Sequence, residues 1–340
     1  MAAVQKFSFA EKHASVDSGA TVVKLGAIPT TCDALVKLGC CVALLFFSVA
    51  ATLLTEASKS SDGTYPYNTF MIPCLVEALK LGASAVLLVS SKLNGDNLVI
   101  SFTAFKFISF SLPAMCYFVS NNCMFFIIRE LGPTTFQITN NLKVLTTGIL
   151  MRLFLGRKLT WLRWKALVLL ALGSAVTQMQ SSSSEDAKKS QVGYFFVLIN
   201  SFASGAGGVA SEKLLKGESQ APVDSIYWQN IQLYFFGLTF GLGSSFSGLN
   251  ASGGNSLLHG FNAWAYATVV ALAAAGLLVS FILKYIDNMA KCFVSALSIV
   301  VVAVVHAAIR NETLQLNILI GIMLTCMALE QYNLPQHDGY

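Results

Sequence analysis

The sequence predicts an all-α membrane protein whose ten transmembrane helices form two inverted repeats of five. Hydrophobic residues fill 55% of its 340 positions and charged residues only 11%, whereas soluble domains carry about 25% charged residues. The apolar residues gather in ten runs, each close to the roughly 20 residues that cross a bilayer. Because five is an odd number of crossings, the second set must run opposite to the first.

In the first set, polar residues interrupt the apolar runs at a few places only. Lys37 lies near the start of the first run, from which its side chain can extend to the interface. Glu77 and Lys80 in the second run have the i, i+3 spacing that permits an ion pair, so they form either a structural pair or part of a gate or substrate site. The third and fourth runs carry amides and Lys143. We expect spans near 34–54, 67–90, 107–128, 133–154 and 161–179.

In the second set, the sixth and seventh runs are rich in glycine, which lets helices approach closely in lipid. The ninth run contains Lys291 and His306. The histidine is typical of a hydrogen-bonded packing residue, with proton coupling as the alternative. We expect spans near 192–212, 226–247, 262–283, 289–309 and 314–333.

These spans fix the domain organisation and the orientation. Loops on the side of the N-terminus hold most of the lysines and arginines, so the positive-inside rule places both termini in the cytosol. The expected segments are a cytosolic N-terminal tail (1–33), a first five-helix repeat (34–179), a polar linker (180–191), a second five-helix repeat (192–333) and a cytosolic C-terminal tail (334–340).

The composition argues against several functional classes. The net charge of +5 is spread over short loops rather than clustered in a nucleic-acid footprint. The cysteines lie in or beside apolar runs, where neither a disulfide framework nor a zinc site is expected. No catalytic Ser/His/Asp or Cys/His set and no HExxH motif occurs. We therefore expect no enzyme activity, no cofactor and no metal.

Two lysines inside spans are the strongest functional signal. A charged side chain at the centre of a bilayer costs about 2.5–3.5 kcal/mol on insertion scales, so it needs a partner or a polar site. Lys143 and Lys291 occupy corresponding places in the fourth and ninth spans. An anionic cargo would neutralise both.

Amide and aromatic side chains surround these lysines at helical spacing. Lysines suit phosphate oxygens, amides read the edge of a base, and an aromatic ring stacks on its face. In the fourth span, Phe136, Asn140 and Lys143 are expected to share one helix face. The predicted substrate-binding residues are Lys143, Lys291, Tyr117, Asn121, Asn122, Phe136, Asn140, Asn230, Asn288 and Ser295.

At these residues the chain resembles the nucleotide-sugar transporters of the drug/metabolite transporter superfamily, in the branch that carries CMP-sialic acid, UDP-galactose and UDP-N-acetylglucosamine. The matching stretches are Glu77-Ala-Leu-Lys-Leu-Gly82, Tyr117-Phe-Val-Ser-Asn-Asn122, Phe136 through Gly148, Tyr227 through Gly237, and Gly276 through Lys291. The chain departs from the family at Phe136-Gln-Ile-Thr-Asn-Asn-Leu-Lys143, where many relatives have two tyrosines.

The resemblance implies the ten-helix drug/metabolite transporter fold and a Golgi membrane location, with the ER membrane as the alternative. It also implies exchange of a cytosolic pyrimidine nucleotide sugar, of the CMP-sialic acid or UDP-galactose type, for lumenal CMP or UMP. Lys143 and Lys291 would hold the phosphate, and Tyr117 with the amides Asn121, Asn122 and Asn230 would recognise the nucleotide. The expected partners are these nucleotides and the lipid bilayer, and a homodimer is compatible with the sequence.

Two other functions fit the same pattern less well. A proton-coupled or gradient-driven metabolite exporter would depend on His306 or Glu77 rather than on Lys143. A membrane scaffold for glycosyltransferases would have no use for buried cations, so Lys143→Ala would leave its function intact.

Overall fold

The computed structural model describes residues 31–60, 65–69, 71–157, 159–178, 191–217, 223–251, 258–309 and 316–333. The predicted tails, apart from residues 31–33, and the linker 180–191, apart from Gln191, lie outside this part of the chain. All regular structure in the described part is helical. The first six helices are α1 (Thr31–Ala57), α2 (Met71–Leu93), α3 (Ala104–Ser109), α4 (Ser111–Thr139), α5 (Leu142–Phe154) and α6 (Trp161–Gln178).

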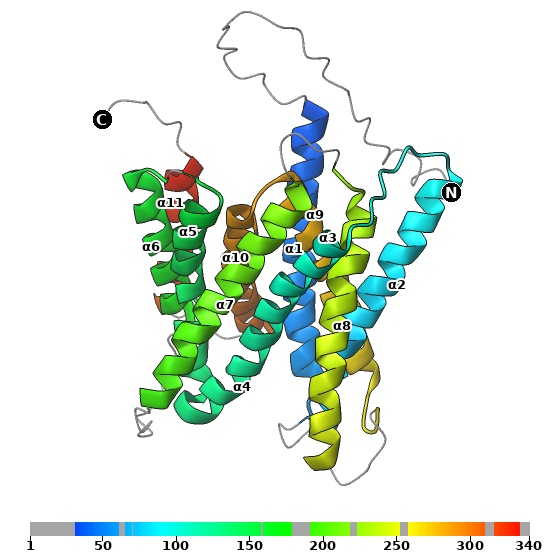
Figure 1. Ribbon diagram of the computed structural model, residues 1–340. Helices are drawn as coiled ribbons and strands as arrows, with labels where there is room; N and C mark the ends of the chain where they lie inside the picture. The colour runs from blue at the N-terminus through cyan, green and yellow to red at the C-terminus, as the bar shows by residue number, and fades with distance from the viewer. Residues whose placement is uncertain are drawn as a thin grey trace, which may run out of the picture.

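The remaining helices are α7 (Gln191–Lys216), α8 (Ile226–Ala251), α9 (Ala263–Tyr285), α10 (Asn288–Ile309) and α11 (Leu316–Asn333). Figure 1 shows them as one bundle of long, roughly aligned helices, with the short α3 leading into α4. Within the described residues, five helices are long and apolar enough to cross a membrane: α1, α2, α7, α9 and α10. The chain is therefore a multi-pass membrane protein.

The structure corrects one predicted helix boundary. The sequence indicated a break near 129–132, between the expected third and fourth spans, but α4 continues through these residues to Thr139. The interruption lies at Asn140–Asn141, where Val144 N–H donates to the Asn141 carbonyl in a tight i→i+3 turn. Unpaired backbone groups are costly in lipid, which favours a continuous helix, and asparagine side chains compete with helical hydrogen bonds.

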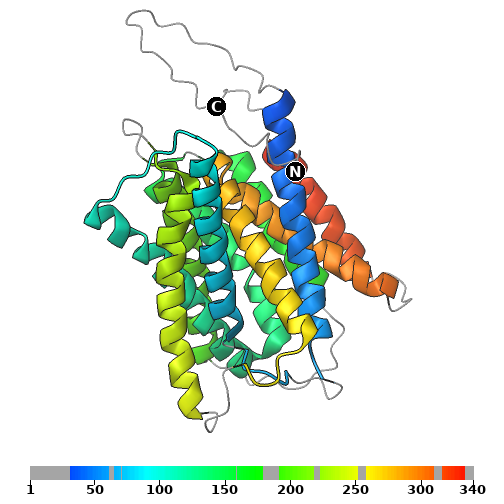
Figure 2. The same ribbon diagram turned by 90° about the vertical axis from the view of Figure 1, so that its right-hand side faces the viewer.

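Helices from the two halves of the sequence pack against each other. The most extensive contacts pair α6 with α11, α4 with α7, α1 with α9, and α2 with α8. In Figure 2, α1 lies beside α9 and α2 beside α8. The main apolar cluster combines Val144, Met151 and Leu167 from the first half with Val209 and Phe293 from the second. This main cluster therefore lies between the two halves of the sequence rather than within either one.

Candidate functional site

Lys143 and Lys291 lie close together near the starts of two helices. Lys143 is in the first turn of α5, directly after the Asn140–Asn141 interruption, and Lys291 is in the first turn of α10. The two ammonium groups interact electrostatically with each other and with the thiol of Cys292. None of the ion pairs between described residues involves either lysine. The structure thus brings together two cations that form no ion pair with a carboxylate in the described part, although Lys291 interacts electrostatically with Glu212.

Tyr117 of α4 is the aromatic neighbour of this pair. Tyr117 interacts electrostatically with Lys291, and the Lys291 Nζ atom is 5.9 Å from the centroid of the Tyr117 ring. The ring packs against α7 at Gly207, where an added Cβ would lie 3.1 Å from Tyr117 Cε1. Glycine at this position therefore lets α7 approach closely enough to hold the tyrosine beside the lysine.

Two buried amides have unused hydrogen-bonding groups. The side chains of Asn230 in α8 and Asn288 in α10 are fully buried, and neither amide has a hydrogen-bond partner among the described residues. Asn288 packs against Gly208, where an added Cβ would lie 2.6 Å from its Nδ2 atom. An unpaired buried amide costs about 1–3 kcal/mol, so both are suited to bonds with a polar ligand.

The other predicted amides differ in their environment. Asn140 accepts a hydrogen bond from Asn200 Nδ2 at 3.4 Å. Asn122 donates to the Phe118 carbonyl of its own helix at 2.8 Å. The side chain of Asn121 is exposed. The structure does not tie these three amides to the lysine pair, and their role in substrate binding stays a prediction.

Phe136 and Ser295 complete the predicted set. The Phe136 ring packs against an apolar cluster that contains Cys123, Ile127, Leu131 and Val197. Because α4 and α5 are interrupted at Asn140–Asn141, Phe136 and Lys143 do not lie on one continuous helix. Ser295 is partly buried in α10, and its carbonyl accepts a hydrogen bond from the Ser298 hydroxyl at 2.7 Å. Base stacking on Phe136 stays a prediction.

A second polar cluster joins α2, α8 and α9. The predicted ion pair is confirmed, with Lys80 Nζ 2.5 Å from Glu77 Oε1. The Lys80 Nζ atom also lies 4.2 Å from the centroid of the Tyr234 ring, and the Tyr234 hydroxyl is hydrogen-bonded to Ser280 at 2.7 Å. A Cβ at Gly276 would lie 2.7 Å from Lys80 Cδ. Sequence spacing predicted the ion pair but not its contacts with α9.

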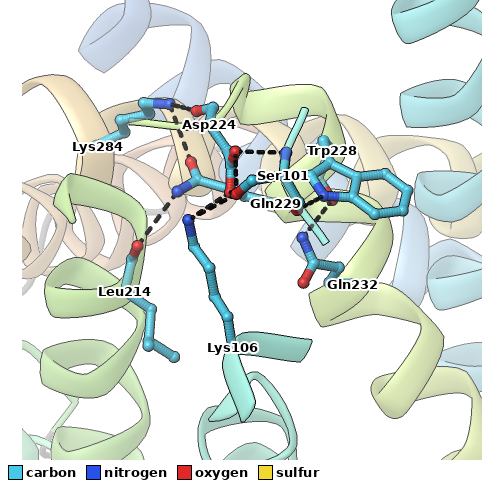
Figure 3. Close-up of polar contacts among 8 residues, drawn as sticks. All are labelled: Ser101, Lys106, Leu214, Asp224, Trp228, Gln229, Gln232 and Lys284. Carbon is cyan, nitrogen blue, oxygen red and sulfur yellow. Dashed lines mark hydrogen bonds and ion pairs between the residues drawn. The ribbon is translucent and has the colours of Figure 1, made fainter. Parts of the chain in front are cut away.

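A third cluster lies where α8 begins and α9 ends (Figure 3). The Asp224 carboxylate accepts hydrogen bonds from Ser101 and is paired with Lys106. Lys284 donates to the Asp224 carbonyl at 2.7 Å and to Gln229 Oε1 at 2.9 Å. Burial opposes ionisation of Asp224, but the bonds from Lys106 and Ser101 outweigh it and lower the pKa of the carboxyl below its usual value.

The same end of the bundle holds an ionic network that the sequence did not predict. The Glu212 carboxylate of α7 is fully buried and accepts bonds from Arg157 Nη2 and Lys216 Nζ, each at 2.7 Å. Arg157 also contacts Asp287 at 3.1 Å. The Asn288 backbone N–H, which opens α10, donates to Glu212 at 2.9 Å. In the sequence Arg157, Glu212 and Asp287 resemble ordinary interfacial charges, since they are far apart along the chain.

Comparison with known proteins places the chain among transporters. The model of the family described as "Nucleotide-sugar transporter" matches residues 32–333. "CMP-sialic acid transporter 1" of rice (Oryza sativa subsp. japonica) is 32% identical over 83% of this chain and 89% of its own length. The Arabidopsis thaliana protein of the same name is 30% identical over 86% and 90%.

A shorter match agrees with this assignment. The "UDP-N-acetylglucosamine transporter" of Rattus norvegicus is 36% identical over 57% of this chain and 61% of its own length. One solved structure, titled only "Crystal structure of protein", superposes with a TM-score of 0.66 at 12% identity. It covers 88% of this chain and 97% of its own, and this likeness concerns the fold alone. The family and these named relatives are transporters rather than enzymes. On this evidence, the chain belongs to the nucleotide-sugar transporter family.

Proposed function

We propose that the protein exchanges a pyrimidine nucleotide sugar, of the CMP-sialic acid or UDP-galactose type, for CMP or UMP across the Golgi membrane. The two plant relatives are named for CMP-sialic acid, and mammalian relatives for UDP-N-acetylglucosamine and UDP-galactose. These cargos share a nucleotide with at least one phosphate. The observation that carries the proposal is the pair Lys143 and Lys291, which interact with each other and form no ion pair with a carboxylate in the described part.

Exchange follows from the energetics of this pair. Two close ammonium groups repel each other and are poorly solvated inside a membrane protein. A bound phosphate relieves both costs, so the loaded carrier changes conformation more readily than the empty one. Nucleotide sugar and nucleoside monophosphate satisfy the same residues, which makes each the return cargo of the other. Tyr117, Asn230 and Asn288 would contact the nucleotide, with Asn121, Asn122, Phe136, Asn140 and Ser295 as further contacts.

We also propose ten spans arranged as a 5+5 inverted repeat, with both termini in the cytosol. In this scheme α3 and α4 together form the third span, α5 the fourth, and α7–α11 repeat the first five spans. The packing supports it. If the two repeats are exchanged, the contact of α4 with α7 becomes that of α9 with α1, and the contact of α5 with α7 becomes that of α10 with α1; all four contacts are present. The contacts α2–α8 and α6–α11 each join equivalent helices of the two repeats, so the exchange leaves them unchanged. The repeats would cover residues 34–179 and 192–333.

The direct test is uptake by proteoliposomes. Vesicles containing the purified protein are preloaded with CMP, UMP, AMP or nothing, and uptake of labelled CMP-sialic acid and UDP-galactose is followed. We expect preloading with CMP or UMP to accelerate uptake at least about tenfold over empty vesicles, because the empty carrier returns slowly. Equal uptake into empty vesicles would contradict exchange, and uptake driven by a pH gradient alone would favour the proton-coupled exporter.

A matched pair of variants tests the role of Lys143 in substrate binding. Lys143→Gln removes a cation without a partner in the described part, whereas Arg152→Gln removes an exposed cation from the same helix. We expect Lys143→Gln to abolish exchange and the thermal stabilisation by CMP, while Arg152→Gln retains both. Normal exchange by Lys143→Gln would contradict the role assigned to Lys143.

A further inference from the structure

Arg157 connects three segments at the end of the bundle where α10 begins. It follows α5, and its two terminal nitrogens reach Glu212 of α7 and Asp287 directly before α10. Glu212 in turn accepts the Asn288 backbone N–H, and Asp287 accepts the Ala290 N–H. We call Arg157, Glu212 and Asp287 the Arg157 latch. It holds the start of α10, one turn from Lys291, against α7 and the end of α5.

A second ion pair occupies the opposite end. His306 Nε2 of α10 lies 2.8 Å from Glu56 Oε2 of α1. We call this pair the His306 latch. Because α10 runs from the Arg157 latch at its start to His306 near its end, the two latches lie at opposite ends of the same helix.

The internal repeat makes the two latches equivalent. Glu212 is near the end of α7, the first helix of the second repeat, and its partner Arg157 follows the fourth helix of the first repeat. Glu56 is near the end of α1, the first helix of the first repeat, and its partner His306 is near the end of the fourth helix of the second. Each latch thus joins the first helix of one repeat to the fourth helix of the other.

We propose that these two ion pairs are the alternating closures of the transport path: the Arg157 latch opens while the His306 latch stays closed, and the reverse. This inference rests on the proposed exchange function. It follows from symmetry. When the protein switches sides, each of the two inverted repeats adopts the conformation that the other repeat had, so a contact that breaks at one end forms at the equivalent place at the other end. The Glu212 carboxylate also interacts electrostatically with Lys291, which links the Arg157 latch to the cation that would hold the cargo phosphate.

The latches differ in strength, which sets the resting state. The Glu212 side chain is fully buried and is paired with both Arg157 and Lys216, and Arg157 engages two carboxylates, so removal of Arg157 leaves the buried Glu212 carboxylate with Lys216 as its single cationic partner among the described ion pairs. The Glu56 side chain is 43% exposed, and His306 is charged only when protonated. Exposed pairs contribute little. The empty protein therefore rests with the Arg157 end closed and the His306 end the easier one to open.

Hydrogen–deuterium exchange of the purified, cargo-free protein tests the proposal. In Arg157→Gln we expect amides at 286–290 to exchange at least about threefold faster, and amides at 56–60 and 304–309 to exchange more slowly than in the wild type. The slower exchange is the decisive result, since mere local damage has no reason to protect the far end. His306→Gln should shift both ends in the opposite sense by a smaller factor.

Two further variants complete the design. Arg157→Gln combined with His306→Gln should return both ends towards the wild-type rates, because the two losses bias the equilibrium in opposite directions. Arg152→Gln, at an exposed cation of α5, is the matched control and should change neither end. If Arg157→Gln does not fold, Arg157→Lys keeps the charge but not the contact of one guanidinium with both carboxylates. It should change the amide exchange rates in the same directions by smaller factors.

The outcomes separate this inference from the proposed function. Faster exchange at 286–290 with no change at the far end overturns the latches, even if nucleotide exchange in vesicles is intact. Opposite shifts at the two ends support the latches, and they do so independently of which cargo is transported. Vesicle uptake without counter-exchange would overturn the antiport proposal alone.

Discussion

At the residue scale, two adjacent side chains of α8 are equally buried but differ in their hydrogen bonding. Both Gln229 and Asn230 are fully buried. Gln229 donates to the Leu214 carbonyl at 3.2 Å and accepts from Lys284 at 2.9 Å (Figure 3), so it joins α7, α8 and α9. Asn230 has no hydrogen-bond partner for either atom of its amide in the described part.

This contrast predicts opposite effects on stability. Asn230→Leu should raise the melting temperature of the empty protein, because it removes unpaired polar groups that cost about 1–3 kcal/mol. The same change should weaken stabilisation by CMP. Gln229→Leu should lower the melting temperature, because it removes an acceptor of Lys284 and the donor to the Leu214 carbonyl. Thermal melts of both variants, with and without CMP, provide the measurement, and equal losses of stability would contradict the distinction.

At the element scale, the start of α10 is fixed by close packing against α7. Asn288 lies against Gly208, so an alanine there would place its Cβ 2.6 Å from the amide nitrogen. We expect Gly208→Ala to destabilise the protein by about 1–3 kcal/mol and to reduce exchange by displacing Lys291. Gly82→Ala in α2, where an added Cβ meets nothing within 4 Å, is the control. The midpoint of unfolding and the rate of nucleotide exchange are measured for both variants. Equal rates of nucleotide exchange would contradict the displacement of Lys291.

The Asp224 cluster gives a prediction about pH. The folded pKa of Asp224 is lowered, so its contribution to stability is present above the unfolded pKa and is lost as pH falls through the folded one. Asp224→Asn should cost about 2 kcal/mol at neutral pH. The difference in melting temperature from the wild type should shrink as pH falls below about 4. A constant difference from pH 7 down to pH 3 would mean that the charge of Asp224 does not matter.

Much of the element pattern can be predicted from the sequence, because hydropathy directly reports which segments avoid water. Each expected span overlaps a helix of the structure. The break after α4 was misplaced because Gly132 and Pro133 look like a loop, whereas the structure interrupts the helix at Asn140–Asn141. The position of a helix break depends on which backbone hydrogen-bonding groups the surrounding helices can satisfy. The local sequence does not contain this information.

The candidate site was predicted in part, for a related reason. Lys143 and Lys291 stand out because charge within an apolar run is rare, although their mutual proximity depends on tertiary structure. The bonds from Arg157 to Glu212 and Asp287 join residues 55 and 130 positions apart. Each of these residues lies at a helix end, where a charged side chain needs no special explanation, so only the folded arrangement reveals the network.

At the scale of the whole molecule, the proposed even number of spans predicts that both termini face the same side. Epitope tags at each end of the chain should both be removed by protease added to sealed Golgi-derived vesicles, while a lumenal marker remains protected. Protection of one tag would imply an odd number of spans and would contradict the inverted repeat. Protection of both would reverse the orientation inferred from the lysine and arginine distribution.

The crossed pairing of helices has a consequence for biogenesis. Because α1 packs on α9, α2 on α8 and α4 on α7, a nascent chain that ends before α7 contains α1 to α6 but few of their native neighbours. Glycines and buried polar groups on those helices would face lipid until the later segments leave the ribosome. A polypeptide truncated in the linker should therefore be degraded by quality control, and co-expression of the missing segment should rescue it.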